Sequence, residues 1–384
     1  MFTVLTNKYP NLRFAKHWEL TKNAWSLLGQ CEVYSRTISN APIQPKFRGQ
    51  MVSSSFVKAA HFSTAIEDNI LSEEEVAKAG QNEDASENKK YYEKEAQNLV
   101  KAYRFLDQEM PEQKEEKSIS ISLIKSLHVL AGKDLGEAFG AVPCEYRNFS
   151  RNNLKYRCAD HEDIEILMHQ LTEWLLEEFN YKRGQEYSEI VLEALVAHIY
   201  LLWIRPFADG NGPTSRLLEN YILLRGGIPP ICSHVLAQHY SASRTEYFRQ
   251  IENASVKRDL NEFIEYALFG LRNGLRQTLE TIQANSRQVT WEKCVYDFFN
   301  ENKIGHESVS LRMRRVAMSM EPDKKYRLDE MKNLNAKIAA EYATLSPLTL
   351  ERDLNKLVSV NLLLKDDVYY KTNSMENIVK IYYS

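Results

Sequence analysis

The sequence is poor in cysteine, and its few cysteines form no pattern. None belongs to a CxxC pair, and they are scattered along 384 residues as Cys31, Cys144, Cys158, Cys232 and Cys294. Disulfide-stapled domains and structural zinc sites need closely spaced cysteines, so both classes are excluded. We therefore expect five free thiols in a protein of a reducing compartment.

An excess of charge of one sign is also missing. The chain carries 49 Lys and Arg against 52 Asp and Glu, a net charge of -3. This balance excludes a global basic field that would attract the whole protein to nucleic acid. A local basic surface is still compatible with it. With 43% hydrophobic and 26% charged residues, the composition is that of a globular protein with two or three domains.

The sequence has no long uninterrupted apolar run. The longest apolar stretch, Val191–Phe207, contains Glu193, His198 and Arg205, and is too short and too charged to span a bilayer. The N-terminus lacks the basic start and the apolar core of a signal peptide. We therefore expect a cytoplasmic protein with no membrane partner, in which this stretch is a buried helix.

Helical periodicity dominates what is present. Apolar residues recur at helical spacing in several long segments, which predicts a mainly α fold. These segments are Tyr92–Glu109, Ile164–Phe179, Ser188–Ile204 and Leu260–Gln283, with a shorter helix expected at Glu292–Asn302.

Three regions are expected along the chain. They are a helical region 1–115, a helical core 116–285 and a C-terminal module 286–384. Within the core, the polar segment Cys144–Asp160 is expected to hold a small β-hairpin.

The C-terminal module shows a different order of elements. Leu345–Val358 predicts an amphipathic turn and helix, and Leu362–Tyr370 predicts two short strands about the turn Asp366-Asp367. After the short helices that precede them, this order is that of a winged helix-turn-helix domain. The helix and the strand entry resemble those of DeoR-like winged helix-turn-helix domains.

The charges of this module favour no single partner. Arg352 and Lys356 lie one helical turn apart and could reach phosphates or base edges of DNA. Local positive charge is added by Arg312, Arg314 and Arg315. Glu351 and Asp353 share the helix and oppose a phosphate field. DNA binding and protein docking or dimerisation, including a homodimer, all stay open.

The strongest chemical signal runs from Arg205 to Arg216 and reads Arg-Pro-Phe-Ala-Asp-Gly-Asn-Gly-Pro-Thr-Ser-Arg. A helix is expected to end before Pro206, and a tight turn through Asp209 to Gly212 to lead into a second helix. The N–H groups and the dipole at that helix N-terminus favour phosphate. Asp209 would hold a Mg²⁺ that bridges the phosphates. Taken alone, the pattern is also compatible with a plain helix connector.

The segment resembles the Fic-family signature HPFx(D/E)GNGRxxR. The agreeing positions are Pro206, Phe207, Asp209, Gly210, Asn211, Gly212 and Arg216. Ala197–Tyr200, Leu127–Leu130 and Gly140–Arg147 resemble the helices before the signature and the entry to the family's substrate-docking flap. The resemblance covers roughly residues 50–285, about three fifths of the chain.

The resemblance implies a protein adenylyltransferase, which transfers AMP from ATP to a Ser, Thr or Tyr hydroxyl of a target protein. It implies ATP and Mg²⁺ as ligands, Asp209 as the metal ligand and Arg216 as a phosphate ligand. It also assigns phosphate binding to Gly210, Asn211 and Gly212. The sequence does not name the target.

Two positions depart from the signature. Arg205 stands where the family has the histidine that takes the proton from the target hydroxyl, and arginine cannot accept a proton near neutral pH. Pro213 stands where the family has its first arginine, so a phosphate cation is lost. His161, His169 and His198 offer no convincing replacement base. We expect retained nucleotide binding without AMP transfer; an active nucleotidyl- or phosphotransferase with an altered mechanism is the alternative.

A second family feature lies upstream. Phe62–Asn69 resembles the inhibitory motif (S/T)xxxE(G/N), with Ser63 and Glu67 in register and Asp68 departing from the usual Gly or Asn. In the family this glutamate pairs with the second signature arginine, here Arg216. Such a carboxylate competes with phosphate oxygens for the guanidinium group. A surface glutamate on an amphipathic helix is the alternative.

Overall fold

The structure, a computed structural model, describes residues 7–81, 89–109, 119–151, 156–302, 304–346, 348–374 and 377. The chain divides into two compact units, Met1–Leu279 and Glu280–Ser384. The division falls within one long helix, α12 (Asn261–Glu301). The expected boundary at 286 falls in the same helix, whereas the expected region 1–115 and residues 116–279 of the expected core lie together in the first unit.

The first unit is a helical assembly, with no strand among its described residues. Its helices are α2 (Lys22–Asn40), α3 (Pro45–Ile66), α4 (Glu73–Ala79), α5 (Lys90–Glu109), α6 (Ile121–Gly132), α7 (Ile164–Glu178), α8 (Tyr187–Ile204), α9 (Asn211–Arg225), α10 (Val235–Ala242), α11 (Arg244–Lys257) and the first part of α12. Short 3-10 turns lie at Gly136–Phe139, His161–Asp163 and Pro230–Cys232. The mainly α prediction is confirmed.

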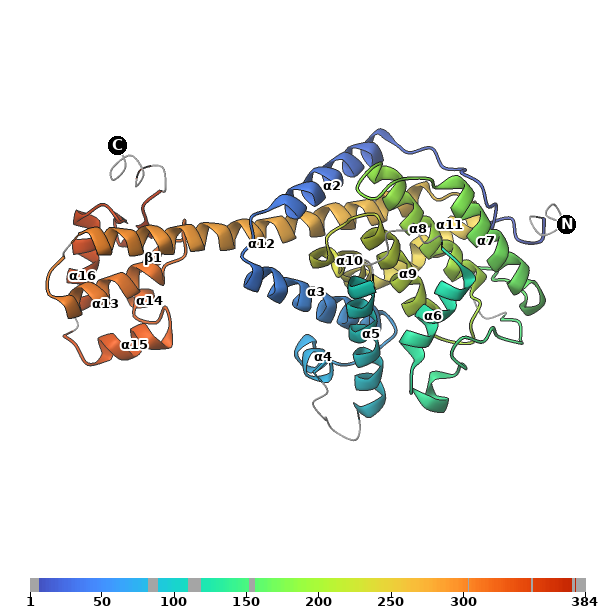
Figure 1. Cartoon of the computed structure of the whole chain (residues 1–384), viewed down its shortest axis with the longest axis horizontal. Coiled ribbons are helices and arrows are strands. Elements are labelled where there is room, and N and C mark those ends of the chain that lie inside the picture. Colours follow the sequence, from blue (N-terminus) through green and yellow to red (C-terminus); the bar gives the residue numbers. More distant parts are fainter. Residues whose placement is uncertain are drawn as a thin grey trace. The chain divides into compact units, whose positions relative to one another are not determined.

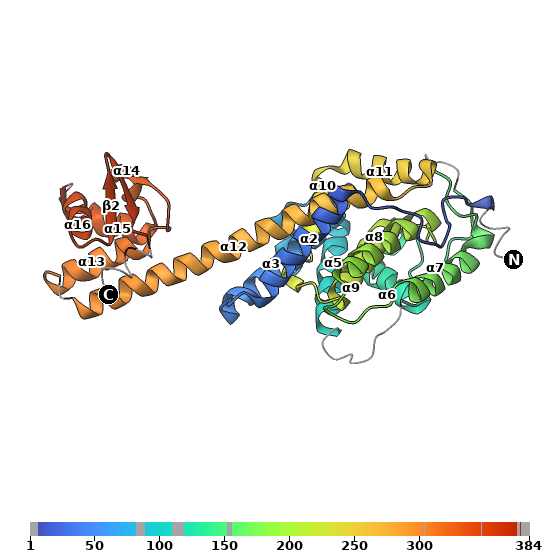
Figure 2. The same ribbon diagram turned by 90° about the horizontal axis from the view of Figure 1, so that it is seen from above.

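Helices α8 and α9 form the centre of this unit and pack side by side (Figures 1 and 2). The expectation that this stretch is too short and too charged to span a bilayer was wrong on composition alone: helix α8 is long and apolar enough, yet 89% of it is buried inside the unit. A helix that is hydrophobic on every side belongs in a core. The prediction of a buried helix in this stretch is therefore confirmed.

Helix α3 carries the expected inhibitory motif and lies next to this centre. It packs against α5, α9 and α10. Helix α5 in turn contacts α6 and α9, so residues far apart in the sequence surround the start of α9 (Figure 1).

The β-hairpin expected within Cys144–Asp160 is not formed by the described residues of that segment, 144–151 and 156–160. Arg147 supplies the reason. Its guanidinium donates to the carbonyls of Phe149 at 2.6 Å, Arg205 at 2.8 Å and also Ala159. This side chain thus satisfies the Phe149 and Ala159 carbonyls, which strand partners would otherwise take, and the described part of the segment is irregular.

A second expectation was also wrong. The separate helices at Leu260–Gln283 and Glu292–Asn302 are parts of one helix, α12. The residues between them are mostly polar, but they include neither proline nor glycine. Polarity alone does not break a helix, because exposed positions of a helix accept such residues.

The second unit combines short helices with a small sheet. Its elements after α12 are α13 (Glu307–Met318), β1 (Tyr326–Arg327), α14 (Leu328–Met331), α15 (Ala336–Ala343), α16 (Leu348–Ser359), β2 (Leu363–Asp366) and β3 (Tyr369–Thr372). The strands are antiparallel in the order β1-β3-β2, with Asp366 opposite Tyr369.

The elements predicted at the end of this unit are present. Helix α16 buries Leu350, Leu354 and Leu357 in a core shared with α13 and α15. The two strands follow, and their turn is Asp367-Val368, one residue later than expected. Asp367 has a positive φ of 54°, which suits aspartate in a tight turn.

Candidate functional site

The predicted loop connects α8 to α9. Helix α8 ends at Arg205, which has a left-handed φ of 50° and precedes Pro206. Gly210 caps α9 with a φ of 72°, a conformation that glycine adopts without strain. Helix α9 already starts at Asn211, so Pro213 lies in its first turn, where a missing N–H costs nothing.

Asn211 holds the loop together. Its side-chain oxygen accepts from Phe207 N at 3.0 Å, and its amide nitrogen donates to Phe207 O at 2.8 Å. Because both ends of this buried amide are engaged, the side chain shapes the loop. Phosphate binding at Asn211 stays a prediction.

His128 of α6 supports the loop from the other side. Its Nδ1 accepts from Cys144 N at 3.1 Å, so Nε2 carries the hydrogen and donates to Asp209 O at 3.0 Å. Its ring stacks on Phe207, with centroids 3.8 Å apart. Burial lowers the pKa of His128 to about 4, which keeps the ring neutral and its two hydrogen bonds intact.

A cavity of about 340 Å³ opens over this loop. It brings together the predicted residues Arg205, Asp209, Gly210, Asn211, Gly212, Pro213 and Arg216, together with Glu67. Its other lining residues are Tyr91, Tyr92, Glu95, Leu99, Ala131, Phe139, Tyr156, Leu202, Tyr247, Phe248 and Ile251. Aromatic and apolar walls with a few charged groups are typical of a small-molecule site.

Arg216 and Glu67 form the predicted pair. Arg216 Nη2 donates to Glu67 Oε1 at 2.8 Å and to Ser63 O at 2.9 Å, while Nε donates to Ser63 Oγ at 2.8 Å. The arginine side chain is 1% exposed and that of Glu67 is 36% exposed. Despite its burial, the pKa of Arg216 is raised, because the Glu67 carboxylate stabilises the cation.

The Glu67 carboxylate also lies on the start of α9. A Cβ added to Gly212 would lie 2.1 Å from Glu67 Oε1, so only glycine leaves room for this contact. A carboxylate at a helix N-terminus occupies the place that favours a phosphate. The Glu67 carboxylate therefore occupies the anion-binding position at the start of α9.

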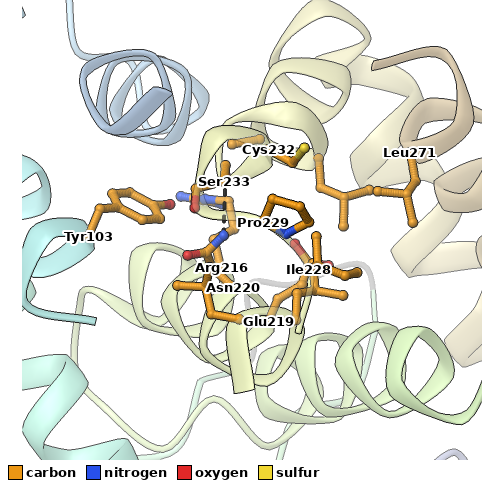
Figure 3. A pocket seen from close by; sticks show the side chains of 13 residues that line it. Tyr103, Arg216, Glu219, Asn220, Ile228, Pro229, Cys232, Ser233 and Leu271 are labelled. Carbon is orange, nitrogen blue, oxygen red and sulfur yellow. Dashed lines mark hydrogen bonds between the residues drawn. The ribbon is translucent and has the colours of Figure 1, made fainter. Parts of the chain in front are cut away.

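A second, smaller cavity lies behind Arg216. Figure 3 shows Arg216, Glu219 and Asn220 of α9 near Tyr103 of α5 and near Ser233, whose carbonyl accepts from Asn220 Nδ2 at 3.3 Å. Its volume of about 10 Å³ is room for about one water molecule. It is too small for a ligand, so the larger cavity is the candidate site.

His198 is a core residue, as expected. It lies 3.2 Å from Glu219 Oε1 and 2.8 Å from the hydroxyl of Tyr247, in a fully buried network. Neither His198 nor any other histidine is among the described residues that line the large cavity. Arg205, at the signature histidine position, lines it instead, with a buried Nε that has no partner among the described residues.

Glu95 of α5 also lines the cavity, although no motif in the sequence points to it. Its Oε2 accepts from Asn69 Nδ2 at 2.8 Å. Burial, with a smaller effect of Glu67, raises the pKa of Glu95 to about 7. One signal could have revealed it: Glu95 interrupts the apolar stripe that continues at Leu99 and Tyr103.

A divalent cation would find one carboxylate of the signature in the cavity. Asp209 uses Oδ1 to accept from Gly210 N at 2.8 Å, which leaves Oδ2 free of that bond. No cluster of three or more metal-binding side chains occurs in the described part of the chain. This fits Mg²⁺, which often takes one or two carboxylates together with phosphates and water.

The C-terminal candidates Arg352 and Lys356 are both exposed on α16. Two assumptions about their neighbours were wrong. Asp353 is buried, accepting from Arg312 at 2.6 and 3.1 Å and from the Tyr342 hydroxyl at 2.8 Å. The acid therefore does not oppose a phosphate at the surface, and Arg312 is not available to bind one.

Comparisons with known proteins agree on one family. Residues 118–223 match the sequence profile of the Fic/DOC family. A protein adenylyltransferase Fic from Nematostella vectensis is 34% identical over 96 residues, 25% of this chain and 21% of that protein. Another from Drosophila willistoni is 32% identical over 161 residues, 39% of this chain and 29% of that protein. The chain thus spans less than a third of the length of these relatives.

Solved structures share the fold. A Fic family protein from Desulfovibrio desulfuricans G20 matches with a TM-score of 0.56 and 16% identity, over 93% of this chain and 98% of that one. Fic-1 from Caenorhabditis elegans matches with a TM-score of 0.51 and 21% identity, over 69% of this chain and 73% of that one. The matching profile shows a Fic/DOC-family domain at residues 118–223, and these solved structures show the fold that the chain shares with Fic proteins.

Proposed function

We propose that this protein binds ATP with Mg²⁺ in the large cavity and acts as a regulator without transferring AMP. The supporting observation is that the cavity joins Asp209, the N-terminus of α9 and Arg216, while an arginine occupies position 205. The phosphate-binding parts are kept, and the proton acceptor is not. The relatives are named protein adenylyltransferases, which favours ATP as the nucleotide.

Each residue has a defined task in this proposal. The N–H groups at the start of α9 and the Arg216 guanidinium would bind phosphate oxygens. Asp209 would hold Mg²⁺ against the phosphates. Arg205 would supply a second cation from the end of α8 and so replace part of the charge lost at Pro213.

AMP transfer would fail because no general base stands at position 205. A target hydroxyl must lose its proton as it attacks phosphorus, and a positioned base is worth on the order of 10²–10⁴ in rate. Arginine stays protonated and cannot take that proton. The protein would therefore bind the nucleotide without reacting with it. Regulation would then depend on whether nucleotide is bound and not on AMP transfer.

We test this with the natural chain. Mg²⁺ and ATP should raise the melting temperature, and labelled AMP should not appear on any protein. Asp209→Ala should lose the Mg²⁺-dependent part of the stabilisation. Robust incorporation of AMP that disappears in Asp209→Ala would overturn the proposal.

A transferase with an altered mechanism is the second candidate, and Glu95 is the observation that favours it. A carboxyl group with a pKa of about 7 inside the cavity has the acidity of a general base. Transfer that is present in the natural chain and absent in Glu95→Gln would establish this alternative.

For the second unit we propose a winged helix, supported by its order of helices and strands. The exposed cations Arg352 and Lys356 on α16 favour a phosphate-bearing partner such as DNA. A cytoplasmic location is also proposed, since all five cysteines are free thiols.

A further inference from the structure

The three residues that follow α3 each contact a different helix. Glu67 accepts from Arg216 of α9 at 2.8 Å, and Asp68 accepts from Arg244 of α11 at 2.8 Å. Asn69 donates to Glu95 of α5 at 2.8 Å. The end of the inhibitory helix is therefore fixed at three points, and two of them lie outside the Glu67 pair.

Arg244 contacts both neighbours of Glu67. Its Nε donates to Ile66 O at 2.7 Å, and its Nη2 donates to Asp68 Oδ2 at 2.8 Å. Ile66 is the last residue of α3, so its carbonyl has no partner within the helix. A cation there satisfies the carbonyl and also suits the negative end of the helix dipole.

Asp68 has a left-handed backbone, with a φ of 66°. Glycine or asparagine adopts this conformation more readily, and aspartate tolerates it at a modest cost. The carboxylate that comes with this choice is the one that Arg244 binds. Asp68 thus turns the chain after α3 and also ties the turn to α11.

We propose that Arg244 is a positioning residue for Glu67. Its hydrogen bonds to Ile66 and Asp68 keep the Glu67 carboxylate bound to Arg216, and this lowers the affinity of the cavity for nucleotide. This inference rests on the proposed function, because it assigns a regulator to the same site. Arg244 itself is absent from the cavity lining described above. It acts through the backbone on both sides of Glu67.

The ion pair with Asp68 alone would be weak, because its side chains are 42% and 79% exposed. The bond to the Ile66 carbonyl is partly buried and links two helices directly. A hydrogen bond to a charged donor is worth more than a neutral one. The positioning effect should therefore depend mainly on the planar guanidinium, which reaches both acceptors at once.

The first test needs no nucleotide. In the full chain, hydrogen exchange reports on the amides of Glu67, Asp68 and Asn69, which donate to Thr64 O and Ala65 O. Arg244→Ala should speed their exchange about three- to tenfold, and Arg244→Lys should speed it by less. Arg249→Ala is the matched control, because Arg249 lies on α11 and pairs locally with Glu246. Unchanged exchange in Arg244→Ala would overturn the inference.

The second test measures the affinity for Mg²⁺ and ATP. Arg244→Ala should tighten binding about three- to tenfold in the natural background and leave it unchanged in a Glu67→Gly background. Tightening in both backgrounds would overturn the inference, because Arg244 would then act without Glu67. If even Glu67→Gly binds no ATP, the proposed function fails, while the exchange test still decides whether Arg244 positions Glu67.

Discussion

The Glu67 carboxylate accepts a hydrogen bond from Arg216 Nη2 at 2.8 Å and at the same time lies against the backbone of Gly212. One side chain thus fills both anion-binding elements of the cavity, the guanidinium group and the start of α9. A phosphate group can bind there only after Glu67 has moved. In the proposed function, this pair is therefore the point at which nucleotide binding is controlled.

Removing the carboxylate should increase the affinity for nucleotide. We expect Glu67→Gly to bind ATP with Mg²⁺ about 10- to 100-fold more tightly, since a charge-assisted bond no longer competes with phosphate. Isothermal titration calorimetry measures the change. Glu67→Gln keeps the shape of the side chain and loses its charge, so its affinity for ATP should lie between those of the natural chain and Glu67→Gly. Equal dissociation constants for the natural chain and Glu67→Gly would contradict the competition.

Restoring the base should restore chemistry. We expect the chain with Arg205→His, Pro213→Arg and Glu67→Gly to transfer labelled AMP, to itself or to added protein. The histidine should account for about 10²–10⁴ of the rate. The matched control replaces Arg205→His by Arg205→Gln, which removes the positive charge without adding a base. Equal incorporation in the two combined variants would rule out the missing base as the cause.

The conformation of the loop should limit which residues position 210 accepts. A Cβ at Gly210 would lie 2.5 Å from the Phe139 ring and 3.1 Å from His128 Nε2, on a backbone with a φ of 72°. We expect Gly210→Ala to lower the free energy of unfolding by about 2–4 kcal/mol, through overpacking and backbone strain together.

The control for this change is Gly136→Ala. Gly136 has a similar φ of 65°, but its added Cβ would meet nothing within 4 Å. Gly136→Ala should therefore lower the free energy of unfolding only by the backbone strain, about 1–2 kcal/mol. Urea denaturation of both variants separates the two contributions, and equal losses would show that the Phe139 contact contributes nothing.

Glu95 should make stability depend on pH. A carboxyl group whose pKa is higher in the folded protein holds its proton more tightly there, so its contribution to the free energy of unfolding falls as pH rises. For Glu95 this fall is expected between pH 4.5 and about 7. The free energy of unfolding should fall by up to about 1.4 kcal/mol per pH unit in this range.

Glu95→Gln should remove that slope. Denaturant unfolding of both chains across this pH range gives the comparison. The variant should gain stability relative to the natural chain toward pH 7, where the carboxylate of the natural chain must be buried in its charged form. Parallel curves for the two chains would contradict the raised pKa.

The exposed cations of α16 allow a direct test of DNA binding. If α16 binds duplex DNA, the double variant Arg352→Ala with Lys356→Ala should weaken binding by the full chain and reduce its salt dependence by about two phosphate contacts. Fluorescence anisotropy at several salt concentrations measures both. Arg249→Ala, with Lys257→Ala, removes the same charge from the first unit as a control. No binding by the natural chain at low salt would favour protein docking instead.

Sequence alone predicted the elements that depend on local pattern. The apolar run of α8, the turn through Gly210 and the strands after α16 follow from periodicity and from residues with special backbone preferences. The pair of Ser63 and Glu67 with Arg216 was also predicted, through the resemblance to a known motif. These features are carried by residues close together in the chain or by a recognised spacing.

Tertiary structure alone decided which polar groups meet. In the described part of Cys144–Asp160 the Arg147 side chain takes the Phe149 and Ala159 carbonyls and no strand pair forms, and Asp353 proved to be buried beside Arg312. Glu95 and Arg244 come to the site from helices outside the signature. Hydrogen-bond partners and burial depend on which helices pack together, and a one-dimensional pattern does not contain that information. The sequence determined the signature with arginine at position 205, and the packing determined how Glu67 is held against Arg216 and Gly212.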